Sequence, residues 1–172
     1  MLYASGVPEE RDLQRVMPSA ERRAKGPVVW MECFEEIPCN PCQPACPTGA
    51  ILPFDDINDL PHVEDARCTG CALCVAACPG LAIFVIDETH SDTHALLKLP
   101  YELRPLPEKG EVVEVLDRTG EVLGTSPVLR VQNPSSFDRT AVITIEIMHS
   151  WVDRARGIRR QRVEAEGEKD ES

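Results

Sequence analysis

The chain has 172 residues, a net charge of −11 and 42% hydrophobic residues. This length allows one domain of ordinary size or two small ones. The negative charge argues against a nucleic-acid-binding protein, because affinity for a phosphate backbone comes from clustered cations. No apolar run approaches the ~18 residues that a membrane-spanning helix needs. The feature to explain is a set of eight cysteines, all between Cys33 and Cys78.

Residues 1–27 predict an N-terminal extension of short helices. An amphipathic pattern runs from Glu9 to Met17, and Gly26-Pro27 ends the charged stretch that follows. Residues 28–31 (Val-Val-Trp-Met) are typical of a strand that enters the cysteine region. The extension lacks the apolar core of a secretory signal, so we expect a cytoplasmic, reducing location. Cysteines that lie close together in such a compartment bind metal more often than they form disulfides.

The second group of cysteines forms a compact motif. Its sequence, Cys68-Thr-Gly-Cys71-Ala-Leu-Cys74-Val-Ala-Ala-Cys78-Pro79, has the spacing C-x2-C-x2-C-x3-C-P. Three closely spaced thiolates can wrap one iron–sulfur cubane, while the fourth lies past a helical turn and points toward a second cluster. The spacing therefore predicts iron–sulfur chemistry.

The first group repeats this motif at an offset of 32 residues. Cys39, Cys42 and Cys46 correspond in this way to the last three cysteines of the second group, and Pro47 corresponds to Pro79. The repeat predicts a pseudo-symmetric domain with two clusters. It breaks at Glu36, which stands where the repeat requires the counterpart of Cys68.

The break leaves the first cluster open to two interpretations. Either Cys33 reaches round a longer loop to complete a cubane, or the cluster lacks that thiolate and is [3Fe–4S] or uses Glu36. We favour Cys33, because a longer loop is a simpler explanation than a cysteine placed there by chance. Zinc is the alternative to iron–sulfur. A zinc ribbon built from the two CxxC pairs would leave four cysteines and the 32-residue repeat unexplained; its ligands would be Cys39, Cys42, Cys71 and Cys74.

These residues resemble bacterial-type ferredoxins with two [4Fe–4S] clusters, over about residues 28–90. The resemblance implies an α+β fold with a β-α-β-β-α-β ferredoxin-like core, which we place at residues 28–95. It also implies that the fourth cysteine of each run ligates the other cluster. Cluster 1 would then take Cys33, Cys39, Cys42 and Cys78, and cluster 2 would take Cys68, Cys71, Cys74 and Cys46.

Residues 96–160 predict a small antiparallel β unit that ends in a helix. Pro100, Pro105 and Pro107 indicate a linker before it, and residues 111–116, 121–124, 128–131 and 141–148 indicate its strands. Residues 151–160 are typical of a short basic helix. Four arginines of this run could dock an acidic partner, although a solvated helix face is the simpler explanation; they are Arg154, Arg156, Arg159 and Arg160. Residues 161–172 are polar and acidic, which is typical of a disordered tail.

No catalytic motif accompanies the cysteines. The glycines form no GxGxxG fingerprint, and no phosphate-binding GK[ST] loop is present. His90 and His94 are four residues apart and could share a metal, but two exposed loop histidines are the simpler explanation. The chain alone therefore carries no active site that the sequence can identify.

The wider context resembles the small iron–sulfur subunits of flavin-dependent dehydrogenase complexes that oxidise amino acids such as proline or hydroxyproline. It rests on residues 31–42 (Met-Glu-Cys-Phe-Glu-Glu-Ile-Pro-Cys-Asn-Pro-Cys) and the β unit. The resemblance implies a hetero-oligomer whose partner subunits hold FAD or FMN. We expect an electron-transfer subunit that relays single electrons between that flavoprotein and an acceptor. A free-standing diffusible ferredoxin is the alternative, and a structural iron–sulfur protein is the third possibility.

Overall fold

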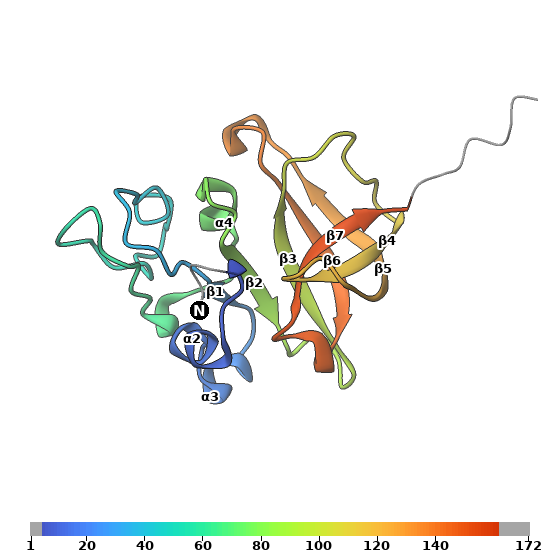
Figure 1. The fold of residues 1–172 in the computed structure, drawn as a ribbon, viewed down its shortest axis with the longest axis horizontal. Coiled ribbons are helices and arrows are strands. Elements are labelled where there is room, and N and C mark those ends of the chain that lie inside the picture. Colours follow the sequence, from blue (N-terminus) through green and yellow to red (C-terminus); the bar gives the residue numbers. More distant parts are fainter. Residues whose placement is uncertain (1–4, 162–172) are drawn as a thin grey trace, which may run out of the picture.

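The computed structural model describes residues 5–161. The tail expected at 161–172 lies outside the described residues apart from Gln161. Over the described part of the chain, no helix combines the length and apolar character needed to cross a bilayer. The structure consists mostly of antiparallel sheet with a few short helices, so the coarse α+β expectation agrees with what is seen (Figure 1).

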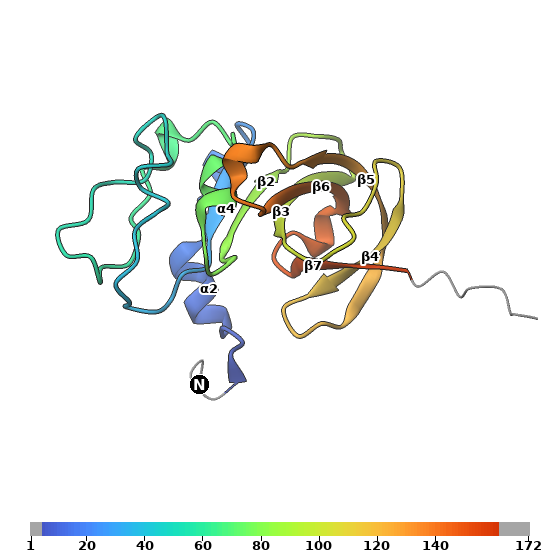
Figure 2. The same cartoon turned by 90° about the horizontal axis from the view of Figure 1, so that it is seen from above.

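Seven strands form one sheet in the order β1-β2-β3-β6-β5-β4-β7, and every neighbouring pair is antiparallel. The strands are β1 (Val28–Met31), β2 (Ile83–Asp87), β3 (His94–Tyr101), β4 (Val112–Asp117), β5 (Val122–Gln132), β6 (Ala141–Met148) and β7 (Ala155–Arg160). The long strand β5 pairs with a different strand along each half of its length: residues 122–127 pair with β4 and residues 128–132 pair with β6. The strands β3 to β7 consequently curl around one another (Figure 2).

The central strands are apolar on both faces. Successive side chains of a strand point to opposite sides, so Val29 and Met31 enter one core while Trp30 enters the other. The core of Val29 and Met31 also contains Cys42 and Cys74, whereas the core of Trp30 contains the inner side chains of the curled strands. Figure 1 shows the cysteine loops on one side of β1 and β2 and the curled strands on the other. One sheet therefore supports both halves of the molecule.

The N-terminal extension forms two short helices, α2 (Glu10–Val16) and α3 (Ala20–Arg23). Ser19 caps α3 by accepting a hydrogen bond from the backbone N–H of Arg22. The Arg22 side chain in turn donates to the carbonyl oxygens of Asp65, at 2.8 Å, and Cys68, at 2.7 Å. The extension is thereby tied to the loop that precedes the second cysteine run.

The expected ferredoxin-like core is only partly present as regular structure. Its outer strands correspond to β1 and β2, and its second helix is α4 (Leu73–Ala77). The equivalent of α4 at an offset of 32 is residues 41–45, which form only hydrogen-bonded turns. Pro44 stands inside that segment and has no N–H to donate to a helix. The expected middle pair of strands is reduced to one bridge between Ile51 and Val63.

Two further expectations about the C-terminal half are wrong. The predicted linker around Pro100 belongs to β3, so the boundary expected between residues 95 and 96 falls inside a strand. The helix predicted over 151–160 is a single 3-10 turn (His149–Trp151) followed by β7. The strands predicted at 121–124 and 128–131 are present, but they form the single strand β5.

A buried ion pair network joins the two halves. Glu32, directly after β1, accepts a hydrogen bond from Arg118 Nε at 2.7 Å and another from Arg156 Nε at 2.7 Å. The Glu32 side chain is only 8% exposed, and the Arg156 guanidinium lies over the rings of Trp30 and Phe84. Burial lowers the pKa of Arg156 to about 10, even though Glu32 favours its charged form. The carboxylate is therefore the counter-charge that this pocket requires.

We expect Glu32→Gln to lower the free energy of unfolding by about 3–5 kcal/mol, because it leaves buried guanidinium charge without its counter-charge. The matched control is Glu114→Gln, which removes the charge of the partner that the exposed Arg159 contacts at 2.6 Å and should cost less than about 1 kcal/mol. Urea unfolding followed by circular dichroism measures both. Equal losses in the two variants would contradict a structural role for the buried network.

Candidate metal centre

The structure brings the eight cysteines together in two groups, each with members from both halves of the repeat. The first cysteine group contains Cys33, Cys39, Cys42 and Cys78. The second cysteine group contains Cys46, Cys68, Cys71 and Cys74. None of the eight forms a disulfide.

A single cavity collects the second cysteine group. All four of its members line this cavity, together with Thr48, Ala50, Ile51 and the loop from Thr69 to Ala72. Val29 of β1 and Val85 of β2 form its apolar floor. Cys46 reaches this cavity from the first run, while the other three cysteines come from the second run. Four thiols around one largely apolar cavity are a donor set that fits a [4Fe–4S] cubane.

Backbone N–H groups point at the sulfur atoms. Val29 and Gly70 both donate to Cys68 Sγ at 3.4 Å, and Ala82 donates to Cys78 Sγ at 3.4 Å. Burial alone would raise the pKa of the Cys46 thiol. Hydrogen bonds from the backbone of residues 48, 50 and 51 and from the Thr48 hydroxyl outweigh it and lower that pKa. The hydrogen bonds around Cys46 therefore favour its thiolate, which is the form that binds metal.

The members of the first cysteine group also act on one another. Burial, followed by the neighbouring Cys78 and Cys39, raises the pKa of Cys33. Burial raises the pKa of Cys42 to about 11, with further contributions from Cys78 and Cys33. Buried thiols that repel one another as thiolates are costly without a cation. A metal cluster supplies that missing positive charge, and the residues present therefore fit such a group.

The alternatives raised by the sequence differ in their geometry. The Cys33 thiol is half-buried beside Cys39 and Cys78, whereas Glu36 is exposed in the loop between Cys33 and Cys39. The zinc alternative needs Cys39 and Cys42 to meet Cys71 and Cys74, but these pairs belong to different groups. Within residues 5–161, no three His, Cys, Asp or Glu side chains are placed to hold a single metal ion. Thiolates that hold a cubane from its corners need not converge on one point.

Two cationic residues near the second cysteine group were not singled out from the sequence. Lys98 Nζ donates to the carbonyl oxygen of Gly70 at 2.6 Å, and Arg22 donates to that of Cys68. Burial lowers the pKa of Lys98, whereas the nearby Cys71 and Cys68 favour its charged form. The signal that could have identified Lys98 is its position as the lone charge in the apolar run Leu96-Leu97-Lys98-Leu99.

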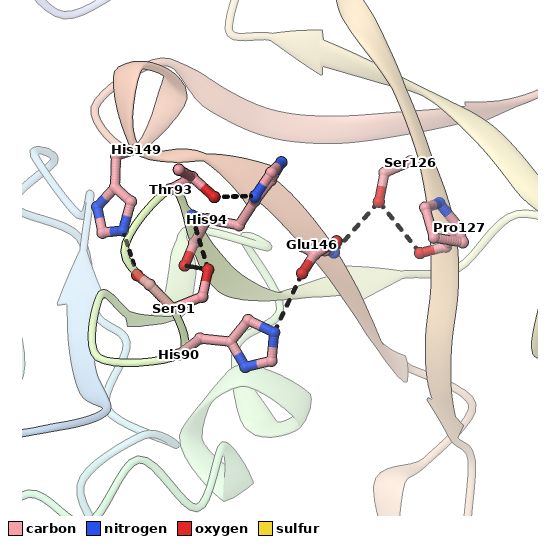
Figure 3. A network of polar contacts seen from close by, with 8 residues as sticks. All are labelled: His90, Ser91, Thr93, His94, Ser126, Pro127, Glu146 and His149. Carbon is pink, nitrogen blue, oxygen red and sulfur yellow. Dashed lines mark hydrogen bonds and ion pairs between the residues drawn. The ribbon is translucent and has the colours of Figure 1, made fainter.

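Three of the four histidines (His90, His94 and His149) occupy a polar network around the turn between β2 and β3 (Figure 3). His90 Nε2 lies 3.1 Å from a carboxylate oxygen of Glu146, and His94 Nδ1 lies 2.8 Å from the Thr93 hydroxyl. His149 Nε2 donates to the carbonyl oxygen of Ser91 at 3.0 Å. His90 and His94 thus have separate partners in this network.

The four arginines of the expected docking run all have acidic partners within the chain. Arg154 pairs with Asp117, Arg159 with Glu114, Arg160 with Glu111 and Arg156 with Glu32. Arg156 is buried and is therefore not part of a surface, while Arg154 and Arg159 keep more than half of their side chains exposed. Docking through the exposed members stays a prediction.

Comparisons with known proteins match the cysteine region. Residues 32–82 match the family described as a 4Fe-4S dicluster domain. The chain is 36% identical over 78 residues to the thiosulfate reductase electron transfer subunit PhsB of Salmonella typhi, covering 42% of this chain and 39% of the relative. It is 43% identical over 51 residues to a tetrathionate reductase subunit of Salmonella typhimurium, covering 30% of this chain and 20% of that relative.

A third relative is an uncharacterized ferredoxin of Methanocaldococcus jannaschii, 38% identical over 68 residues, which cover 39% of this chain and 40% of the relative. The chain thus spans two fifths or less of the length of these relatives. No solved structure is significantly similar to it. The family match encloses all eight cysteines and both groups that the structure forms from them. Residues 32–82 of the chain therefore match a ferredoxin-type 4Fe-4S dicluster domain.

Proposed function

We propose that the chain is an electron-transfer subunit that carries single electrons through two [4Fe–4S] clusters. The observation that carries this proposal is the interleaving of the two cysteine groups, in which each run lends its last cysteine to the other group. Such an exchange places two clusters close together. A protein that used a cluster only to hold its fold would have no need of a second one beside it.

For cluster 1 we propose the first cysteine group as ligands, with Cys33 rather than Glu36 as the fourth. For cluster 2 we propose the second cysteine group. A [4Fe–4S] cluster supplies one-electron transfer when it is bound. The protein's own part is to exclude water through Val29, Val85 and the other apolar wall residues, and to direct N–H groups at the sulfurs. Hydrogen bonds and burial of this kind set the potential of such a centre.

We propose a catalytic oxidoreductase subunit as the partner. PhsB and the tetrathionate reductase relative are by name parts of reductases, which supports an assembly of several chains. The resemblance of residues 31–42 to subunits of amine dehydrogenases favours a flavoprotein, with FAD or FMN in the partner. The similarity to a ferredoxin keeps a free-standing carrier as the second candidate. We propose the cytoplasm as the compartment, because cysteines that lie close together as proposed metal ligands are typical of a reducing location.

Anaerobic purification of the chain from its native cells tests the function. We expect about eight iron atoms per chain and two reducible centres by EPR, together with a co-purifying flavoprotein. Zinc in place of iron, or iron that no reductant changes, would overturn the electron-transfer proposal. A chain that is loaded with iron but purifies alone would favour the free-standing ferredoxin.

We expect Cys33→Ser to convert cluster 1 to a three-iron form or to lose it, because one of its four thiolates is then missing. The matched control is Glu36→Gln in the same loop, which should leave the iron content and the EPR spectrum unchanged. EPR of the oxidised protein reports the three-iron form directly. A spectrum altered by the Glu36 variant and not by the Cys33 variant would reverse the ligand assignment.

We expect Gly70→Ala to lose about half of the iron, that of cluster 2. Gly70 has φ +65°, and a Cβ there would lie 2.5 Å from Cβ of Pro27, so the loop between Cys68 and Cys71 must move. Gly110→Ala is the matched control, since Gly110 also has positive φ but open space around its Cβ position. Iron analysis after gel filtration distinguishes them. Full iron in the Gly70 variant would show that this loop does not hold a cluster.

A further inference from the structure

Lys98 occupies a special position in the central sheet. It lies opposite Val85 of β2 and opposite Thr144 of β6. Directly paired residues of antiparallel strands point to the same face. Val85 belongs to the core that contains Cys42 and Cys74, so Lys98 extends toward the cysteine loops, while its neighbours Leu97 and Leu99 enter the opposite core.

The ammonium group is fixed at the centre of the second cysteine run. Lys98 Nζ donates at 2.6 Å to the carbonyl oxygen of Gly70, which lies between Cys68 and Cys71. The N–H of the same glycine donates to Cys68 Sγ at 3.4 Å. One glycine thus connects a half-buried positive charge to a proposed cluster ligand. Coulomb interactions at such short range are strong in a site that is partly shielded from water.

The first cysteine group has a different electrostatic environment. The Glu35 carboxylate, two residues after Cys33, places negative charge near this group. Arg11 and Arg15 line a cavity that Cys33 also lines, and Arg11 pairs with Glu9 at 3.1 Å. The second cysteine group has instead a cation bound directly to its loop at Gly70, and Arg22 bound to the carbonyl of Cys68.

From this difference we infer that Lys98 is a positioning residue whose charge raises the reduction potential of cluster 2 above that of cluster 1. One electron from an external donor then resides on cluster 2, because a nearby cation stabilises the more negative, reduced form. The inference rests on the proposed function and adds a direction to it: electrons enter at cluster 1 and leave from cluster 2.

Three variants of Lys98 separate charge from hydrogen bonding. Lys98→Gln keeps a donor for the Gly70 carbonyl without charge, Lys98→Arg keeps both, and Lys98→Met keeps neither. Arg130→Gln is the matched control for a nearby cation: Arg130 lies opposite Thr144 on the same face, two strands from Lys98, and its charge acts on Lys98, whereas Lys98 is the residue bonded to the Gly70 carbonyl. Dithionite titration of the iron-loaded chain, monitored by EPR, gives the potential of each cluster. The cluster 2 signal is the one that Cys71→Ser alters.

We expect Lys98→Gln and Lys98→Met to lower the reduced-to-oxidised ratio of cluster 2 roughly tenfold at a fixed potential, about 59 mV for one electron. Lys98→Arg and Arg130→Gln should stay near the unmodified protein. An unchanged potential in the Gln variant, or an equal fall in the Arg variant, would overturn the inference. If the Met variant does not load, the Gln and Arg pair decides. An unmodified chain without two reducible clusters would overturn the proposed function as well.

Discussion

The alternation of side chains along β1 and β2 is the constraint on which the rest of the structure depends. Both strands are apolar on both faces, so neither face can be left to water. The cysteine loops cover one face with Val29, Met31 and Val85 beneath them. The other face presents Trp30, Phe84 and Ile86, which are buried by the curled strands. The cysteine domain without its C-terminal strands would expose this large apolar surface.

The ion pair network fixes how these layers meet. Glu32 follows β1 and precedes Cys33, so the same residue that anchors Arg118 and Arg156 also determines where the first cysteine loop begins. Arg156 contacts Trp30 and Phe84 on the face opposite the cysteines. Buried charge of this kind is weak evidence for stability, but its directional hydrogen bonds favour a single arrangement. Packing of the β unit and placement of Cys33 are therefore coupled.

The sequence predicted the repeat far better than the strands around it. The offset of 32 residues identifies α4 and the turns at 41–45 as equivalents. This offset can be read from the sequence because it depends only on the spacing of the cysteines along the chain. Strand β3 escaped prediction because Pro100 suggests a linker. In the structure Pro100 pairs with Val142 of β6. It lies two residues beyond Lys98, where the pairing of β3 with β2 ends, so no residue of β2 requires the N–H that proline lacks. Strand β7 was predicted as a helix because the spacing of its arginines resembles a charged helix face. Its pairing with β4 joins segments that are far apart in the sequence, and the local pattern does not reveal it.

The same long-range pairing explains why the surroundings of the two cysteine groups differ although the repeat makes their cysteines alike. A repeat copies only what lies inside it, here the cysteines and the prolines that follow them. Arg22 and Lys98 come from outside the repeat, from α3 and β3, and both bind the loop of the second run. Each flank therefore supplies a cation that is hydrogen-bonded to the loop of the second run, whereas Arg11 and Arg15 of α2 only line a cavity beside Cys33. Unequal potentials favour transfer in one direction, which two identical centres could not impose.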